Sequence, residues 1–146
     1  MPTRSARTAW NGDLQTGSGQ VELSSSGVGT YEVSFPKRAA DNADGTTSPE
    51  ELVAAAHSAC YAMSLANGVT QAGGKVQGLD VKADVTLGAD PNGGFKLTGI
   101  VLTVRGEIDG MDDDAFQAAA QAAKQGCPIS KALAAVDISL DATLEG

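Results

Sequence analysis

The chain has 146 residues, of which 42% are hydrophobic and 4% aromatic, and it carries a formal net charge of −8. This hydrophobic fraction excludes a disordered chain, and the length is that of one ordinary domain. The ten lysines and arginines are scattered, which argues against nucleic acid as a partner because phosphate binding needs clustered basic residues. No apolar run reaches 18 residues, so we expect no membrane span.

The first forty residues predict short β-strands at 8–14, 20–23 and 31–35, separated by turns rich in glycine and asparagine. No apolar stretch follows the arginines at the N-terminus, so we expect no secretory signal and a cytoplasmic location. Paired cysteines in that reducing compartment are more often catalytic or redox-active than structural. Residues 35–47 are expected to be irregular, and they carry Lys37 and Arg38.

A helix is predicted to begin at Ser48, an N-cap residue followed by Pro49 and by Glu50 in the first turn. It is expected to end at 67–68 or at 73–74, where glycines occur. Its small apolar residues indicate burial nearly all round. One face is predicted to consist of Leu52, Ala55, Ala56, Ala59, Cys60, Met63 and Ala66.

Two long strands, 76–87 and 95–106, are predicted on either side of a hairpin turn at 90–94. A helix at 112–124, a short helix from Cys127-Pro128 to 133 and a strand at 136–142 complete the order. The pattern is α+β, with an antiparallel β-sheet in a single domain spanning 1–146. One small sheet cannot cover a helix that is apolar on all sides, so we expect an intimate homodimer around it.

Cys60 and Cys127 are the only thiols, and they lie too far apart in sequence for a Cys-x-x-Cys motif. Cys127 directly precedes Pro128 at a predicted helix start, where backbone N–H groups favour a thiolate. Local reasoning therefore ranks Cys127 as the more activated thiol. Burial of Cys60 among alanines raises its pKa unless a cation lies close.

The segments Thr-Ser-Pro-Glu-Glu-Leu-Val-Ala-Ala-Ala-His-Ser-Ala-Cys (47–60) and Gly-Cys-Pro-Ile-Ser-Lys-Ala-Leu (126–133) resemble the family of osmotically inducible protein C (OsmC) and organic hydroperoxide resistance (Ohr) proteins. The resemblance covers the whole order of predicted elements and is nearer to the OsmC branch, because its candidate arginine, Arg38, lies just before the long helix. It implies an intertwined homodimer in which an antiparallel sheet wraps a central buried helix.

The resemblance also implies a thiol-dependent peroxidase that reduces organic hydroperoxides to alcohols and leaves hydrogen peroxide open as a further substrate. Cys60 would attack the peroxide and form a sulfenic acid, and Cys127 would resolve it as a disulfide. Arg38 and Glu50 match the activating pair of the family. An external dithiol, with a lipoyl-type dithiol as the candidate, would be required, and no metal or other cofactor.

Helix geometry limits how Glu50 reaches Cys60, because ten residues of a straight helix span about 15 Å. Either Arg38 bridges much of that distance, or Glu50 of a partner's antiparallel helix lies beside Cys60. We favour active sites shared between the two subunits of the dimer.

The residues leave three alternatives to the peroxidase open. In the first, the two cysteines are unrelated buried thiols. In the second, the protein is a non-enzymatic dimer that senses redox state or binds a small molecule. The third concerns the histidine. His57, one turn before Cys60, is a packed histidine or the base of a Cys-His hydrolase. Ligand spacing for zinc is absent. The apolar residues Leu52, Ala56, Tyr61, Met63 and Phe116 either line a mouth for apolar substrates or belong to the core.

Overall fold

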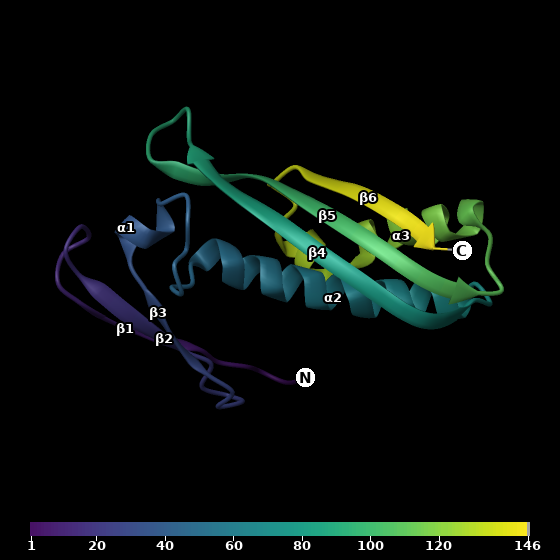
Figure 1. The fold of residues 1–146 in the computed structure, drawn as a ribbon, viewed down its shortest axis with the longest axis horizontal. Helices are drawn as coiled ribbons and strands as arrows, with labels where there is room; N and C mark the ends of the chain where they lie inside the picture. The colour runs from purple at the N-terminus through teal and green to yellow at the C-terminus, as the bar shows by residue number, and fades with distance from the viewer. Residues whose placement is uncertain (146) are drawn as a thin grey trace. The chain divides into compact units, whose positions relative to one another are not determined.

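The computed structural model describes residues 1–145, and they form two compact units, Met1–Leu52 and the residues from Val53 onward (Figure 1). Strands and helices are both present in the order β-β-β-α-α-β-β-α-α-β. The predicted α+β class is therefore confirmed.

The first unit contains a three-stranded antiparallel meander of β1 (Arg7–Asn11), β2 (Ser18–Glu22) and β3 (Thr30–Val33), in that spatial order. The turn after β1 uses Gly12 at φ 93°, a conformation that glycine adopts without steric cost. The following segment, predicted to be irregular, contains a short helix, α1 (Phe35–Arg38). Its N-cap is Ser34, whose hydroxyl oxygen accepts a hydrogen bond from the Lys37 backbone N–H. This cap was the signal that the sequence prediction missed.

The long helix α2 (Pro49–Gln71) begins as predicted, with the Ser48 hydroxyl accepting a hydrogen bond from the Glu51 backbone N–H at 3.1 Å. Beyond the first turn of α2, the side chains that one chain buries recur every fourth residue and are His57, Tyr61, Leu65 and Val69. Burial of the remaining sides by a second copy stays a prediction. Met63, which the sequence analysis placed on another face of this helix, is 73% exposed in the single chain. Within one chain α2 therefore buries a single stripe, rotated from the one that small-residue spacing suggested.

The second unit contains a sheet of β4 (Lys75–Ala89), β5 (Phe95–Asp109) and β6 (Ile138–Glu145). β4 and β5 form the predicted antiparallel hairpin. β6 pairs with β5 in parallel, with Ile100 opposite Ile138, so the prediction of a wholly antiparallel sheet is wrong at this strand. The two helices between β5 and β6 supply the long crossover that a parallel pair requires.

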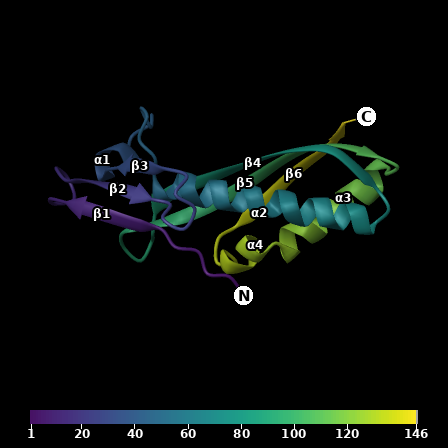
Figure 2. The same ribbon diagram turned by 90° about the horizontal axis from the view of Figure 1, so that it is seen from below.

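Those helices, α3 (Asp113–Gly126) and α4 (Pro128–Ala132), lie with α2 on one face of the sheet, as Figures 1 and 2 show. Asp112 caps α3 by accepting a hydrogen bond from the Ala115 N–H at 2.8 Å. Gly106 leaves room for the Phe116 ring, which would lie 2.9 Å from an added Cβ. The core between helices and sheet consists of Tyr61, Leu65, Val69, Ile100, Leu102, Val104, Phe116, Ala120, Ala123 and Cys127.

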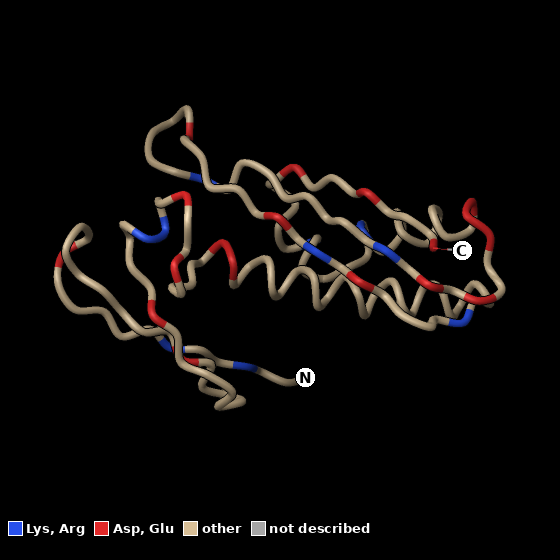
Figure 3. Tube along the Cα trace, in the orientation of Figure 1, with Lys and Arg blue, Asp and Glu red and all other residues tan. Residues whose placement is uncertain are grey.

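Both basic and acidic residues are distributed over both units (Figure 3). The connection from β5 to α3 is acidic, with Asp109, Asp112, Asp113 and Asp114 in close succession. Across residues 1–145, no helix combines the length and apolarity needed to cross a bilayer.

Candidate functional site

The two cysteines meet in the second unit, although 67 residues separate them in sequence. Cys60 lies on α2, and Cys127 lies at the junction of α3 and α4. Their sulfur atoms are 3.1 Å apart, and both residues are free thiols. Cys127 is fully buried, whereas Cys60 is partly exposed. The fold therefore produces a buried dithiol of which only the Cys60 side meets solvent.

The surroundings of Cys127 favour its thiolate. Burial alone would raise the pKa of this thiol, but hydrogen bonding from the Cys60 thiol and from the backbone N–H and hydroxyl of Ser130 outweighs burial and lowers the pKa. The backbone N–H of Ile129 acts in the same direction. This agrees with the expectation from the sequence that the thiol at the start of α4 is the more activated one.

The pKa of Cys60 is shifted in the opposite direction. Burial raises its pKa, and the neighbouring Cys127 thiol adds to the rise. The backbone of Ile129 and the hydroxyl of Ser64 oppose it without reversing it. Of the two adjacent thiols, Cys127 therefore loses its proton more readily, and its sulfur lies close enough to Cys60 for a proton to pass between them.

Arg38 and Glu50, the predicted activating pair, bind each other in the first unit. The guanidinium donates from Nη2 at 2.7 Å and from Nε at 3.0 Å to Glu50 Oε1, and from Nε at 3.2 Å to Oε2. The Glu50 side chain is 10% exposed and that of Arg38 33%. The forked contact joins the end of α1 to the first turn of α2, and it pairs the two residues within one chain.

His57 is fully buried and binds a residue that the sequence analysis did not single out. Its Nε2 lies 2.7 Å from the hydroxyl oxygen of Ser130, which is itself only 5% exposed. Burial lowers the pKa of His57, so the imidazole is neutral near pH 7. The position of Ser130 three residues after Cys127, on the first turn of α4, was the available signal.

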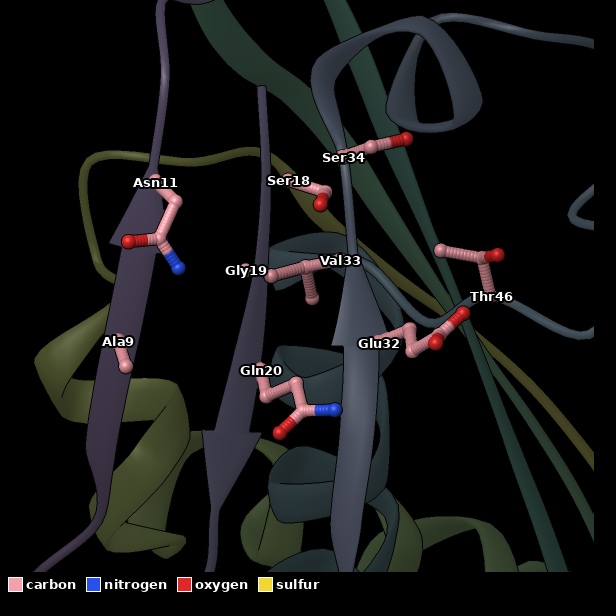
Figure 4. Close-up of a pocket in the computed structure, with 9 residues that line it drawn as sticks. All are labelled: Ala9, Asn11, Ser18, Gly19, Gln20, Glu32, Val33, Ser34 and Thr46. Atoms are coloured by element: carbon pink, nitrogen blue, oxygen red, sulfur yellow. The ribbon is translucent and has the colours of Figure 1, made fainter.

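The first unit has a polar hollow of about 440 Å³ on its sheet, with Asn11, Gln20 and Glu32 around it (Figure 4). None of the predicted site residues lines this hollow. A second hollow of about 580 Å³ lies between α2 and α3 and includes Ser64, one turn beyond Cys60. Of the residues left open between a substrate mouth and the core, Tyr61 and Phe116 are fully buried core residues.

Within residues 1–145, no group of three or more histidine, cysteine, aspartate and glutamate side chains is arranged to hold a metal ion.

Residues 41–141 match the family described as OsmC-like protein. The chain belongs to the OsmC-like family. It is 36% identical to peroxiredoxin OsmC of Escherichia coli (strain K12) over 93% of this chain and 92% of the relative. It is also 30% identical to organic hydroperoxide resistance protein-like 2 of Staphylococcus epidermidis, over 75% of this chain and 77% of that protein.

Solved structures show the same OsmC-like architecture. An organic hydroperoxide resistance protein from Elizabethkingia anophelis is 28% identical and aligns with a TM-score of 0.77, covering 99% of each chain. The OsmC-like fold of the single chain, expected from the sequence resemblance, is thereby confirmed.

Proposed function

We propose that the protein is a cysteine-based peroxidase that reduces organic hydroperoxides to alcohols with Cys60, Cys127, Arg38 and Glu50. The observation that supports this most strongly is the approach of the two sulfur atoms to 3.1 Å across 67 residues of sequence. Two unrelated core cysteines have no reason to lie this close together. The names of the relatives, a peroxiredoxin and organic hydroperoxide resistance proteins, support the same class of reaction.

In the proposed cycle Cys60 is the first nucleophile because it is the thiol that solvent reaches. Its proton passes to the Cys127 thiolate as its sulfur attacks the outer peroxide oxygen. The O–O bond breaks, Cys60 becomes a sulfenic acid, and the departing alkoxide takes up a proton to give the alcohol. Cys127 then loses its proton and attacks the Cys60 sulfur. The S–S bond forms, and hydroxide leaves and is protonated to water.

Two electrons must then return from an external dithiol, for which a lipoyl-type dithiol is our candidate. Thiolate attack on the disulfide restores both cysteines. We propose that no metal, haem or flavin takes part, and that the protein works in the cytoplasm, where thiols stay reduced.

Arg38 is proposed to stabilise the negative charge that develops on sulfur and on the leaving oxygen, with Glu50 holding the guanidinium in place. We further propose a homodimer with shared active sites. The exposed Met63 and the small residues Ala55, Ala56 and Ala59 leave an apolar side of α2 for a second copy to cover. Mixing Cys60→Ser subunits with Arg38→Ala subunits tests this, since a shared site predicts partial recovery of activity.

The decisive experiment mixes reduced protein with cumene hydroperoxide and an excess of dihydrolipoamide. Sustained consumption of peroxide is expected, with loss of turnover in Cys60→Ser. A single stoichiometric oxidation that then stops would contradict the proposal and favour the redox-sensing alternative. Hydrogen peroxide in a parallel assay measures how far the activity extends beyond organic substrates.

A further inference from the structure

Two buried polar side chains beside Cys127, those of His57 and Ser130, have no role in the proposed peroxidase cycle. His57, Ser130 and Cys127 are 0%, 5% and 0% exposed. His57 Nε2 lies 2.7 Å from Ser130 Oγ, and Ser130 occupies the first turn of α4, which Cys127 begins. Buried polar groups are kept where they satisfy one another, so this pair calls for a reason.

The tautomer of His57 determines whether its Nε2 donates or accepts the hydrogen bond with Ser130. Its Nδ1 is buried and finds no hydrogen-bond partner among the described residues. A proton on Nδ1 would leave a buried N–H unpaired, which is costlier and rarer than an unpaired acceptor. We therefore place the proton on Nε2, which donates to Ser130 Oγ. The Ser130 hydroxyl then keeps its own proton to donate onward.

We propose that His57 is a positioning residue, whose Nε2–H holds the Ser130 hydroxyl so that it donates to the Cys127 sulfur. The pKa of Cys127 supports this arrangement, because the Ser130 hydroxyl is among the groups that lower it. A neutral imidazole is required, and burial of His57 favours that form by lowering its pKa. The opposite tautomer would turn the hydroxyl towards His57 and remove it from the sulfur.

The other titratable groups that face Cys127 come from α2 and are the Cys60 thiol and the Tyr61 phenol. Tyr61 stays neutral, since burial raises its pKa and its hydroxyl donates to the Ala120 carbonyl. The hydrogen-bond arrangement stands without the proposed function, and only its catalytic consequence rests on it. That consequence is that Ser130 and His57 speed the attack of Cys127 on oxidised Cys60.

The test is a pH titration of the Cys127 thiolate by its absorbance at 240 nm, in a Cys60→Ser background with Cys60→Ser/Cys127→Ser as the blank. Ser130→Ala is expected to raise the pKa by about one unit, the loss of one hydrogen bond to a charged group. His57→Leu is expected to raise it as well, whereas His57→Gln, which keeps an N–H donor, restores most of the original value. Ser58→Ala is the matched control, since that hydroxyl donates to Ala55 in its own helix.

The combined His57→Leu/Ser130→Ala variant separates positioning from a general effect on the core. If His57 acts through Ser130, the double variant shifts the pKa no further than Ser130→Ala alone. An additional shift, or an unchanged pKa in Ser130→Ala, would overturn the inference. Should His57→Leu not fold, Ser130→Ala and His57→Gln decide it: a rise in the first with little change in the second supports it, and equal rises overturn it.

A kinetic measurement connects His57 and Ser130 to the cycle. After a single addition of peroxide, disulfide formation in Ser130→Ala is expected to slow about threefold, because a higher pKa lowers the thiolate fraction but raises nucleophilicity. The titration requires no peroxide, so failure of the proposed peroxidase would leave its result intact. An unshifted pKa with full turnover would reject the positioning role alone.

Discussion

The contact between Arg38 and Glu50 makes a prediction that can be worked out from its geometry. Glu50→Gln keeps the size of the side chain but removes the charge that holds the guanidinium. The wild-type pair has three N–O contacts between 2.7 and 3.2 Å, and an amide has only one oxygen to offer to that fork. Arg38 then samples other positions, and less of the protein is ready to stabilise the proposed reaction.

Hydrogen bonds to charged groups contribute about 1.5–3 kcal/mol when buried. Because the Arg38 side chain is 33% exposed, water compensates for part of this hydrogen-bond energy. We therefore take about 1–1.5 kcal/mol as the free energy lost when Arg38 is no longer held in place. A loss of 1.4 kcal/mol corresponds to a factor of about ten. We therefore expect kcat/KM for cumene hydroperoxide to fall about tenfold in Glu50→Gln. Arg38→Lys should lose at least as much, since an ammonium cannot make the forked contact.

The assay is steady-state peroxide consumption with excess dithiol, accompanied by thermal unfolding to confirm an intact fold. Asp44→Asn is the matched control, because Asp44 pairs with Lys37 of the same helix α1 at 2.9 Å but in an exposed position. Its effect on kcat/KM should be negligible. The reasoning is refuted if Glu50→Gln keeps wild-type kcat/KM, or if Glu50→Gln and Arg38→Lys reduce it additively rather than as one unit.

Further outcomes are expected elsewhere in the second unit. Tyr61→Phe removes a buried hydrogen bond of 2.8 Å to the Ala120 carbonyl, which should cost about 1–2 kcal/mol and lower Tm by about 3–6 °C in calorimetry; an unchanged Tm would contradict this. In Cys127→Ser, peroxide should leave a sulfenic acid on Cys60 that reacts with dimedone and is detected by mass spectrometry. If the dimedone adduct instead forms on Cys127 in Cys60→Ser, the assigned roles are reversed. Burial lowers the pKa of His57 in the native state, so below pH ~6.5 the unfolded chain binds a proton that the native chain does not, and stability falls as the pH falls. Urea midpoints at pH 7.5 and 5.5 should therefore differ more in the wild type than in His57→Gln, and equal differences would argue against this linkage.

Features that depend on local chemistry were predictable from the sequence. The start of α2 follows from Ser48 and Pro49, and the β4–β5 hairpin follows from its glycine-rich turn. The short helix α1 was missed because one serine cap and a proline are weak signals beside a polar loop. Strong local signals, such as an N-cap followed by proline or a glycine-rich turn, therefore predicted where these elements begin.

Features that depend on distant partners were not predictable in the same way. Alanine spacing on α2 is nearly featureless, so it could not select the stripe through His57 and Leu65 that faces the sheet. The direction of β6 depends on where α3 and α4 return the chain, and the alternation of its side chains is the same for either direction. The approach of Cys60 to Cys127 was predicted only through the family resemblance. The contact between His57 and Ser130 depends on how α2 and α4 pack, which the sequence alone does not show.

The unequal exposure of the two sulfurs gives the proposed cycle a direction on the return path. A reductant approaching the oxidised protein meets the Cys60 sulfur first, because Cys127 is enclosed by the core. In the proposed cycle the mixed disulfide with the reductant would therefore form on Cys60, with Cys127 as the leaving group. A thiol of lowered pKa leaves faster, so the groups around Cys127 that promote closure of the bond also ease its opening.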